Sequence, residues 1–175
     1  ELGSVVPWWS VLSAPEFDGT NLLSNDKIAK FYATGEEAVA KALARTAEIA
    51  RTHGARAVWS GGGIGSTAID FGCGVGRLAS ALATRFASVY CVDHSTAHLG
   101  LAARSIQGRE ASRLHYVATA QAGAEIINEA ADFVLSLLSL QHMVPQLQVA
   151  ALEHLCDALR VGGLGRVQLL TGYSD

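Results

Sequence analysis

A turn with glycine at every second position constrains the fold of this chain more than any other feature. Ala68–Phe71 reads as a short buried strand, and the apolar positions of 78–83 follow helical spacing. Between them stand Gly72, Gly74 and Gly76. Glycine permits backbone angles closed to other residues and lets a ligand approach the main chain. The N–H groups of such a turn, at a helix N-terminus, suit an anionic or electron-rich group.

The spacing of these glycines distinguishes two classes of nucleotide-binding turn. A dinucleotide fingerprint that starts at Gly72 needs a third glycine at position 77, where this chain has Arg77. The chain instead reads D-x-G-x-G-x-G from Asp70 to Gly76. This pattern resembles the cofactor-binding motif of class I S-adenosylmethionine-dependent methyltransferases. It disfavours a Rossmann-type oxidoreductase.

A second acid supports the same interpretation. Ser88–Asp93 reads as the next strand and ends in a carboxylate. Asp93 follows the glycines by roughly 20 residues, the separation that a ribose-binding carboxylate requires. An ordinary aspartate in a turn after a strand is the alternative, and the two features together favour cofactor binding.

Repeated strand and helix units predict a doubly wound parallel α/β sheet. We expect strands at 68–71, 88–93, 113–119, 131–138 and 165–171, and helices at 77–85, 96–106 and 147–159. Leu140–His142 resembles the family's Leu-[Glu/Gln]-His after strand 4. Leu159–Gly163 resembles its Leu-[Lys/Arg]-Pro-Gly-Gly turn, with Val161 in place of proline. The resemblance covers residues 66–171 and implies a three-layer αβα fold with strand order 3-2-1-4-5.

The sequence also suggests how the chain divides into an N-terminal arm and a domain. Residues 1–33 are aromatic and irregular, and we expect them to form an N-terminal arm to a methyltransferase domain at 34–175. Thr34 and Glu37 match a capping box, which predicts a helix over 34–54. The family's sheet adds a helix and an antiparallel hairpin after strand 5. We expect these to be missing here, leaving strand 5 as an open edge that could pair two copies as a homodimer.

The resemblance implies that S-adenosylmethionine binds at the carboxyl ends of the strands. Asp93 would hold the ribose, and Asp70 would lie near the ammonium group of the cofactor. The full set of implied cofactor-binding residues is Asp70, Gly72, Cys73, Gly74, Asp93, His94, Ala120, Ser136 and Leu137. The acid that often follows strand 3 in the family is absent, because the chain has Thr-Ala-Gln at 119–121. Arg77 could reach the cofactor carboxylate, but we favour a side chain that is solvated on the helix.

Two residues are candidates for catalysis. His142 follows strand 4, where a histidine could act as a general base, with a packing or helix-start role as the alternative. Tyr32 is expected near the methionine end of the cofactor. His98 and His115 are expected to be structural, and no cluster has metal-ligand spacing. The predicted function is methyl transfer to a small molecule, with a non-catalytic methyltransferase-like binding or partner domain as the alternative.

Composition and charge argue against several other functional classes of protein. The net charge is -3 and the pI is near 6.1, so nothing in the charge favours a nucleic-acid partner. No segment approaches the ~18 apolar residues of a membrane span. The three scattered cysteines favour free thiols in a reducing compartment, and we expect a cytoplasmic protein.

Overall fold

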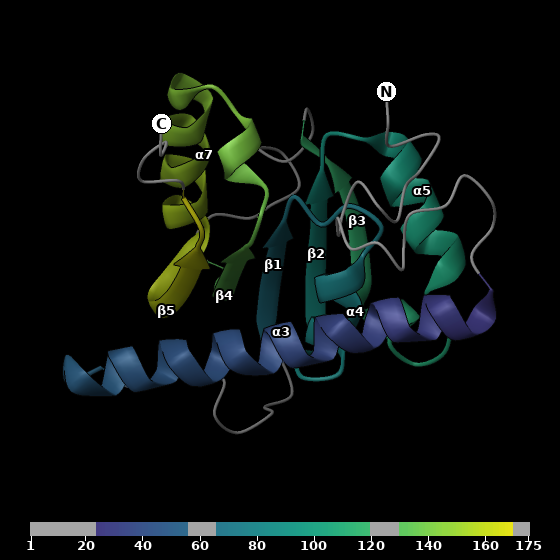
Figure 1. The fold of residues 1–175 in the computed structure, drawn as a ribbon. Helices are drawn as coiled ribbons and strands as arrows, with labels where there is room; N and C mark the ends of the chain where they lie inside the picture. The colour runs from purple at the N-terminus through teal and green to yellow at the C-terminus, as the bar shows by residue number, and fades with distance from the viewer. Residues whose placement is uncertain (1–23, 56–65, 120–129, 170–175) are drawn as a thin grey trace, which may run out of the picture.

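The computed structural model describes residues 24–55, 66–119 and 130–169. Its centre is a five-stranded, all-parallel sheet in the order β3-β2-β1-β4-β5 (Figure 1). The strands are β1 (Thr67–Phe71), β2 (Ser88–Asp93), β3 (Leu114–Ala118), β4 (Ala131–Ser136) and β5 (Leu159–Val167). The predicted fold class and strand order are therefore confirmed. Beyond β5 the structure describes no further strand, so β4 is its one neighbour within the described residues.

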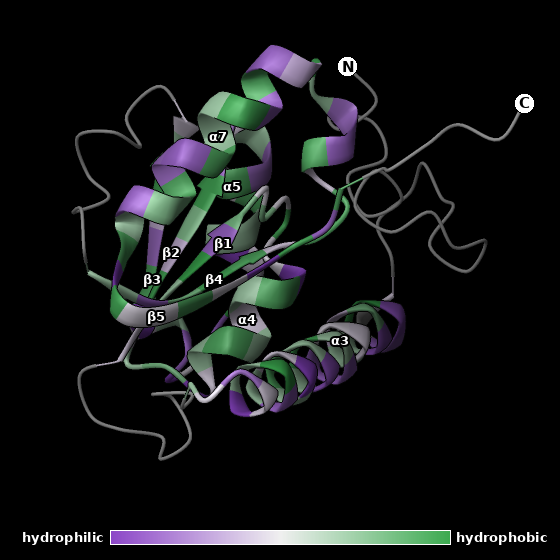
Figure 2. Ribbon diagram, turned by 90° about the vertical axis from the view of Figure 1, so that its left-hand side faces the viewer, coloured by the Kyte–Doolittle hydropathy of each residue, from purple (hydrophilic) through white to green (hydrophobic). Residues whose placement is uncertain are grey.

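The helices are α3 (Asn25–Thr52), α4 (Arg77–Ala83), α5 (Thr96–Ser105) and α7 (Pro145–Ala158), with short 3-10 turns η2 (Ala111–Arg113) and η3 (Leu140–His142). Helices α3 and α4 lie on one side of the sheet and α7 on the other (Figure 2). Helix α3 runs across the strands and packs on α4 (Figure 1). Within the described ranges, no helix is long and apolar enough to cross a membrane.

Each face of the sheet carries its own apolar core. On the α3 and α4 side, Leu82, Phe86 and Phe133 are fully buried, and the two phenylalanine rings stack with centroids 6.0 Å apart. On the α7 side, Ile69 and Leu155 belong to the second cluster. All six residues of β4 are buried, as expected for a central parallel strand covered on both faces.

The predicted start of the first helix is wrong. Helix α3 begins at Asn25, not at Thr34, and the amide N–H of Ile28 donates to the carbonyl of Ser24 at 3.0 Å. Thr34 is not a cap, because its hydroxyl donates back to the Phe31 carbonyl at 2.7 Å. The Ser-Asn-Asp run at 24–26, which resembles a loop, is composed of the residues that favour a helix start. The predicted end holds, since Gly54 follows the helix with φ +72°.

The observed ends of the other helices and strands differ from the predicted ends by a few residues, except at the last strand, where the difference is larger. Ser95 caps α5, since its hydroxyl accepts from the His98 amide at 3.2 Å. Strand β5, expected at 165–171, begins at Leu159 and ends at Val167. Its register shifts between its pairings with Ala131 and with Phe133, so the predicted turn is a bulge within the strand.

Candidate functional site

The glycine turn after β1 is held against the end of β2. The amides of Gly72 and Cys73 both donate to the Val92 carbonyl, at 2.7 and 3.1 Å. The Gly74 amide donates to Asp93 Oδ2 at 2.8 Å. The amides of Gly72, Cys73 and Gly74 therefore fix the turn, and they are not the N–H groups that a ligand would use. What the turn offers a ligand is a close approach to its backbone.

Two of the glycines are required by their conformation and by their neighbours. Gly72 and Gly76 have φ of +78° and +82°, which other residues rarely adopt. A Cβ on Gly72 would lie 1.8 Å from the hydroxyl oxygen of Ser139, just beyond β4. A Cβ on Gly76 would lie 2.7 Å from Ile106. The turn is therefore packed between the segment after β4 and the end of α5.

Asp93 organises the carboxyl end of β2. Besides the Gly74 amide, it accepts the Ser95 amide at Oδ1 at 2.8 Å, and His94 Nδ1 lies 3.4 Å from that oxygen. The residue is only 5% exposed, yet it lines the large cavity described below. A carboxylate has about four lone-pair positions, so each oxygen can accept one further hydrogen bond from a ligand.

Asp70, in β1, and Arg77, at the start of α4, are two buried residues of opposite charge on either side of the glycine turn in the sequence. Their exposures are 1% and 6%. Both carboxylate oxygens of Asp70 and the Nε of Arg77 lack a hydrogen-bond partner in the described part of the chain. Burial raises the pKa of Asp70 from 3.8 to about 7, and Asp93 adds to the rise. The Arg77 charge opposes it, as does the Ala79 backbone N–H, which lies outside normal hydrogen-bond geometry.

The burial of Arg77 corrects the expectation that this side chain is solvated. Helix α3 passes over it: Arg77 Nη1 donates weakly to the Thr34 hydroxyl at 3.4 Å. A Cβ on Gly35 would lie 2.1 Å from the Arg77 carbonyl oxygen. Burial lowers the pKa of the Arg77 guanidinium, while Asp70 favours its charged form. Glycine inside the long helix is thus the sequence signal for this close approach.

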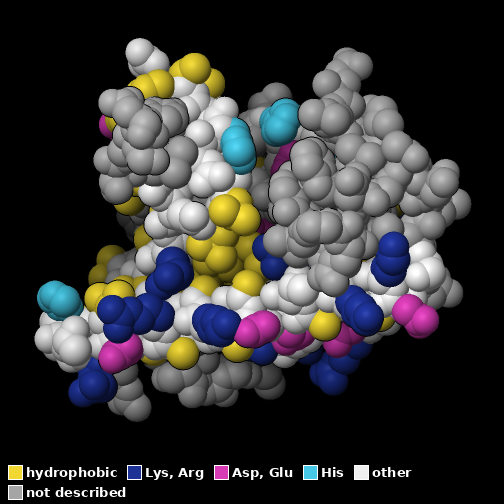
Figure 3. All heavy atoms as spheres, viewed as in Figure 1, with side chains coloured by type: hydrophobic (Ala, Val, Ile, Leu, Met, Phe, Trp, Pro, Cys, Tyr) yellow, Lys and Arg dark blue, Asp and Glu magenta, His cyan; other side chains and the backbone are white. Residues whose placement is uncertain are grey.

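These elements converge on a cavity of about 750 Å³ at the carboxyl ends of the strands. Figure 3 shows this side of the molecule, with histidine side chains (cyan) in the upper middle of the view. Seven of the predicted residues line the cavity: Gly72, Cys73, Gly74, Asp93, His94, Leu137 and His142. Ala120 lies outside the described residues.

Three predicted site residues are described but do not line the cavity. Asp70 lies behind the turn, and Ser136 is fully buried with its hydroxyl unpartnered among the described residues. Tyr32 donates its hydroxyl to the Val75 carbonyl at 3.0 Å. Burial raises the pKa of Tyr32 to about 12, partly offset by Ser105, so its proton is firmly held. The contacts of Tyr32 brace the back of the glycine turn.

The cavity also contains residues that sequence reasoning did not assign to the site. Arg77, His98 and His154 line it together with the predicted His94 and His142. Leu138, also in the lining, has φ +60°, a strained value for a side chain of this kind. His154 lies on α7, far along the chain, and no local spacing indicates its position. No group of three or more metal-ligating side chains occurs among the described residues.

Sequence and structure comparisons agree with this geometry. The methyltransferase domain family matches residues 68–163, more than half of the chain. No curated protein matches the chain in sequence.

Three of the solved structures that resemble this chain have TM-scores slightly above 0.5. The first is a candidate S-adenosylmethionine-dependent methyltransferase from Methanococcus maripaludis, with 22% identity, 79% coverage of this chain, 62% of that chain and TM-score 0.52. An amino pentose methyltransferase from Micromonospora echinaspora, solved with S-adenosylmethionine, has 20% identity, 79% and 53% coverage, and TM-score 0.53. Magnesium protoporphyrin IX methyltransferase from Synechocystis PCC 6803, solved with S-adenosylhomocysteine, has 21% identity, 91% and 68% coverage, and TM-score 0.52.

At these identities the structural likeness shows the fold, and the chain spans less than two thirds of the first of these structures. The family match covers the strand, glycine turn and helix that build the cavity. The chain therefore belongs to the methyltransferase domain family and has the αβα fold of class I S-adenosylmethionine-dependent methyltransferases.

Proposed function

We propose that this chain transfers a methyl group from S-adenosylmethionine to a small-molecule acceptor. The observation that carries the proposal is the convergence of the glycine turn, Asp93 and Arg77 at one cavity, with the buried Asp70 behind the turn. The two neighbours solved with this cofactor or its product are named for an amino pentose and a magnesium protoporphyrin, both small molecules. That supports a small-molecule acceptor for this chain.

Asp93 is the residue that would bind the ribose. Its two carboxylate oxygens each accept one amide and retain capacity for a hydroxyl group. Because the Gly74 and Ser95 amides orient the carboxylate, it is held in place before a ligand arrives. Preorganisation of this kind reduces the entropy lost on binding.

The buried charges fit the amino-acid end of the same cofactor. An unpartnered buried carboxylate costs free energy, and a cationic group nearby removes much of that cost. Asp70 has no hydrogen-bond partner among the described residues, and Arg77 has an unpartnered Nε and lines the cavity. An ammonium and a carboxylate on one ligand complement this pair. We infer that Asp70 favours the ammonium and that Arg77 favours the carboxylate.

His142 is the proposed general base. It is exposed at the end of η3, lines the cavity, and its Nε2 lies 3.3 Å from the Gln141 amide nitrogen. S-adenosylmethionine supplies an electrophilic methyl group on a sulfonium. An acceptor with a proton on O, N or C needs a base to remove that proton, and histidine titrates in the useful range.

Calorimetry with S-adenosylmethionine tests the binding part of the proposal. We expect Asp93→Ala to weaken binding by more than about 1 kcal/mol, because a hydroxyl pair loses a charged acceptor. Asp93 also holds the turn, so Asp93→Asn, which keeps one acceptor oxygen, and thermal unfolding of both variants separate ribose contact from loss of structure. Unchanged affinity in a folded Asp93→Ala variant would refute the ribose assignment.

Turnover distinguishes an enzyme from a methyltransferase-like binding domain. Release of S-adenosylhomocysteine, followed by mass spectrometry with a panel of small-molecule acceptors, is expected to exceed cofactor breakdown without acceptor. Tight cofactor binding with no acceptor-dependent release from any candidate would favour the binding-domain alternative.

A further inference from the structure

A second hollow lies between the C-terminal half of α3 and β5. Its volume is about 670 Å³, and Leu137 lines both this hollow and the cofactor cavity. We call it the α3–β5 groove; its lining is Thr46, Ile49, Ala50, His53, Ala55, Leu137, Leu164, Gly165, Arg166, Val167, Gln168 and Leu169. The groove therefore lies next to the site at the carboxyl end of β4, with Leu137 between the two.

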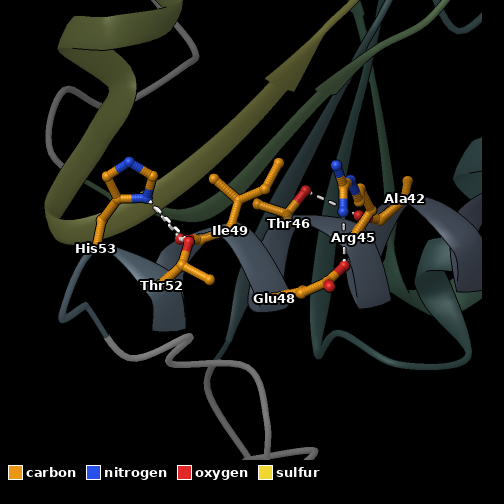
Figure 4. Close-up of polar contacts among 7 residues, drawn as sticks. All are labelled: Ala42, Arg45, Thr46, Glu48, Ile49, Thr52 and His53. Carbon is orange, nitrogen blue, oxygen red and sulfur yellow. Dashed lines mark hydrogen bonds and ion pairs between the residues drawn. The ribbon is translucent and has the colours of Figure 1, made fainter.

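The walls of the α3–β5 groove are mainly apolar. Ile49 and Leu169 are 45% and 41% exposed, which is high for side chains of their size. Figure 3 shows hydrophobic side chains (yellow) above α3 and Lys and Arg side chains (dark blue) along α3. Figure 4 shows Thr46, Ile49 and His53 on the side of α3 that faces β5. An apolar hollow of several hundred Å³ with a few polar groups is typical of small-molecule sites.

The polar groups of the groove are cationic or neutral. The Arg166 side chain is half-buried and makes no hydrogen bond or ion pair within the described part of the chain. The His53 ring is oriented by its Nδ1, which lies 2.9 Å from the Ile49 carbonyl and 3.1 Å from the Thr52 hydroxyl. Thr46 donates its hydroxyl to the Ala42 carbonyl at 2.8 Å.

No acidic residue is among the described residues that line the groove. The acid on this part of α3 is already paired with a basic residue of the same helix. Arg45 and Glu48 pair with each other at 2.8 Å, and neither lines the groove. Arg166 is thus an uncompensated cation in a partly apolar hollow. A ligand carboxylate or another planar anionic group is the natural partner for such a guanidinium.

We propose that the α3–β5 groove binds the methyl acceptor, and that this acceptor is a small molecule with an apolar body and an anionic group held by Arg166. The identification of this ligand as the methyl acceptor rests on the proposed function. The binding of an apolar anion in the groove is a separate claim, and it can be measured without turnover. The body lies along Ile49 and Leu164, and the opposite end reaches Leu137 at the edge of the cofactor cavity.

Three matched probes test the charge preference: hydrocinnamate, hydrocinnamyl alcohol and hydrocinnamylamine, which share an apolar body and differ in charge. Each is titrated into the isotope-labelled protein saturated with S-adenosylhomocysteine, and amide shifts in the nuclear magnetic resonance spectrum report both affinity and place. We expect hydrocinnamate to bind about tenfold more tightly than the alcohol, since one charge-assisted hydrogen bond supports a difference of this size. The largest shifts should fall on α3 and β5.

Substitutions locate the preference. Arg166→Gln should remove the tenfold difference and leave the affinity for the alcohol unchanged, whereas Arg166→Lys should retain part of it. Arg109→Gln is the matched control, because Arg109 is exposed and lies outside the groove. Ile49→Trp, at an exposed position, should fill the groove and weaken both probes even if Arg166→Gln fails to fold.

Equal affinity for the acid and the alcohol, tighter binding of the amine, or equal losses for both in Arg166→Gln would overturn the inference. So would shifts confined to the cofactor cavity. Failure of the protein to bind S-adenosylhomocysteine would instead count against the proposed function. The two failures are therefore distinguishable in one set of titrations.

Discussion

Replacement of Asp70 by asparagine should stabilise the fold, although Asp70 lies behind the glycine turn of the proposed site. The carboxylate is buried and unpartnered within the described residues, and burial raises its pKa from 3.8 to about 7. The folded-state pKa exceeds the unfolded value, so the folded protein binds this proton more tightly. The associated stability is complete below about pH 4 and is lost as the pH rises through about 7.

The size of the effect follows from the pKa change. A rise of about three units, at about 1.4 kcal/mol per unit, corresponds to roughly 4 kcal/mol of lost stability at pH 8. Relaxation around the charge and entry of water reduce this, so we expect Asp70→Asn to gain about 2–4 kcal/mol at pH 8. The gain should be at least about 1 kcal/mol smaller at pH 5, because the wild-type carboxyl group is then mostly protonated in the folded state.

Urea unfolding at pH 5 and pH 8 measures both values. Asp132→Asn is the matched control, since Asp132 is also buried but pairs with Arg160 and accepts the Thr67 amide at 2.7 Å. Loss of that pairing should destabilise the control by about 1–3 kcal/mol at pH 8. The same Asp70→Asn substitution should weaken S-adenosylmethionine binding. A destabilised Asp70→Asn variant at pH 8, or a gain independent of pH, would refute the reasoning.

Further substitutions test the turn and the catalytic assignments. Gly72→Ala should cost about 2 kcal/mol or more, because its Cβ would lie 1.8 Å from the Ser139 hydroxyl oxygen, and Ser139→Gly in the same chain should recover part of that loss in urea unfolding. Tyr32→Phe should lose about 1 kcal/mol of stability, because the hydrogen bond from its hydroxyl to the Val75 carbonyl is removed, with little change in turnover. A large fall in turnover without loss of stability would restore a catalytic role. His142→Ala should lower turnover by roughly 10²-fold or more at constant cofactor affinity, and parallel losses of affinity and stability would indicate packing instead.

The sheet order could be predicted from the sequence because its signals are local. The glycine turn, the acid at the end of β2 and the apolar run of β4 each lie within one short stretch, and the same stretches build the core. The positions of Gly74 and Asp93 beside the cavity could be predicted for the same reason, since their separation along the chain is a known requirement of the turn.

The features that sequence reasoning missed depend on contacts between distant segments. Arg77 looks like a solvated helix residue until α3 is packed over it at Thr34 and Gly35. Tyr32 was expected at the methionine end of the cofactor, but it does not line the cavity and its hydroxyl donates to the Val75 carbonyl, an orientation that spacing cannot indicate. The helix start at Asn25 was missed because the same polar residues serve both as loops and as caps.

A crystal structure of the protein with bound S-adenosylhomocysteine is the most direct test of the central claim, because it shows where each end of the ligand lies. The predicted result is a ligand along the carboxyl ends of β1, β2 and β4, with its ribose hydroxyls on the Asp93 carboxylate, its carboxylate beside Arg77 and its ammonium at the glycine turn in front of Asp70. A ligand bound elsewhere, or one whose ribose makes no contact with Asp93, would contradict the account.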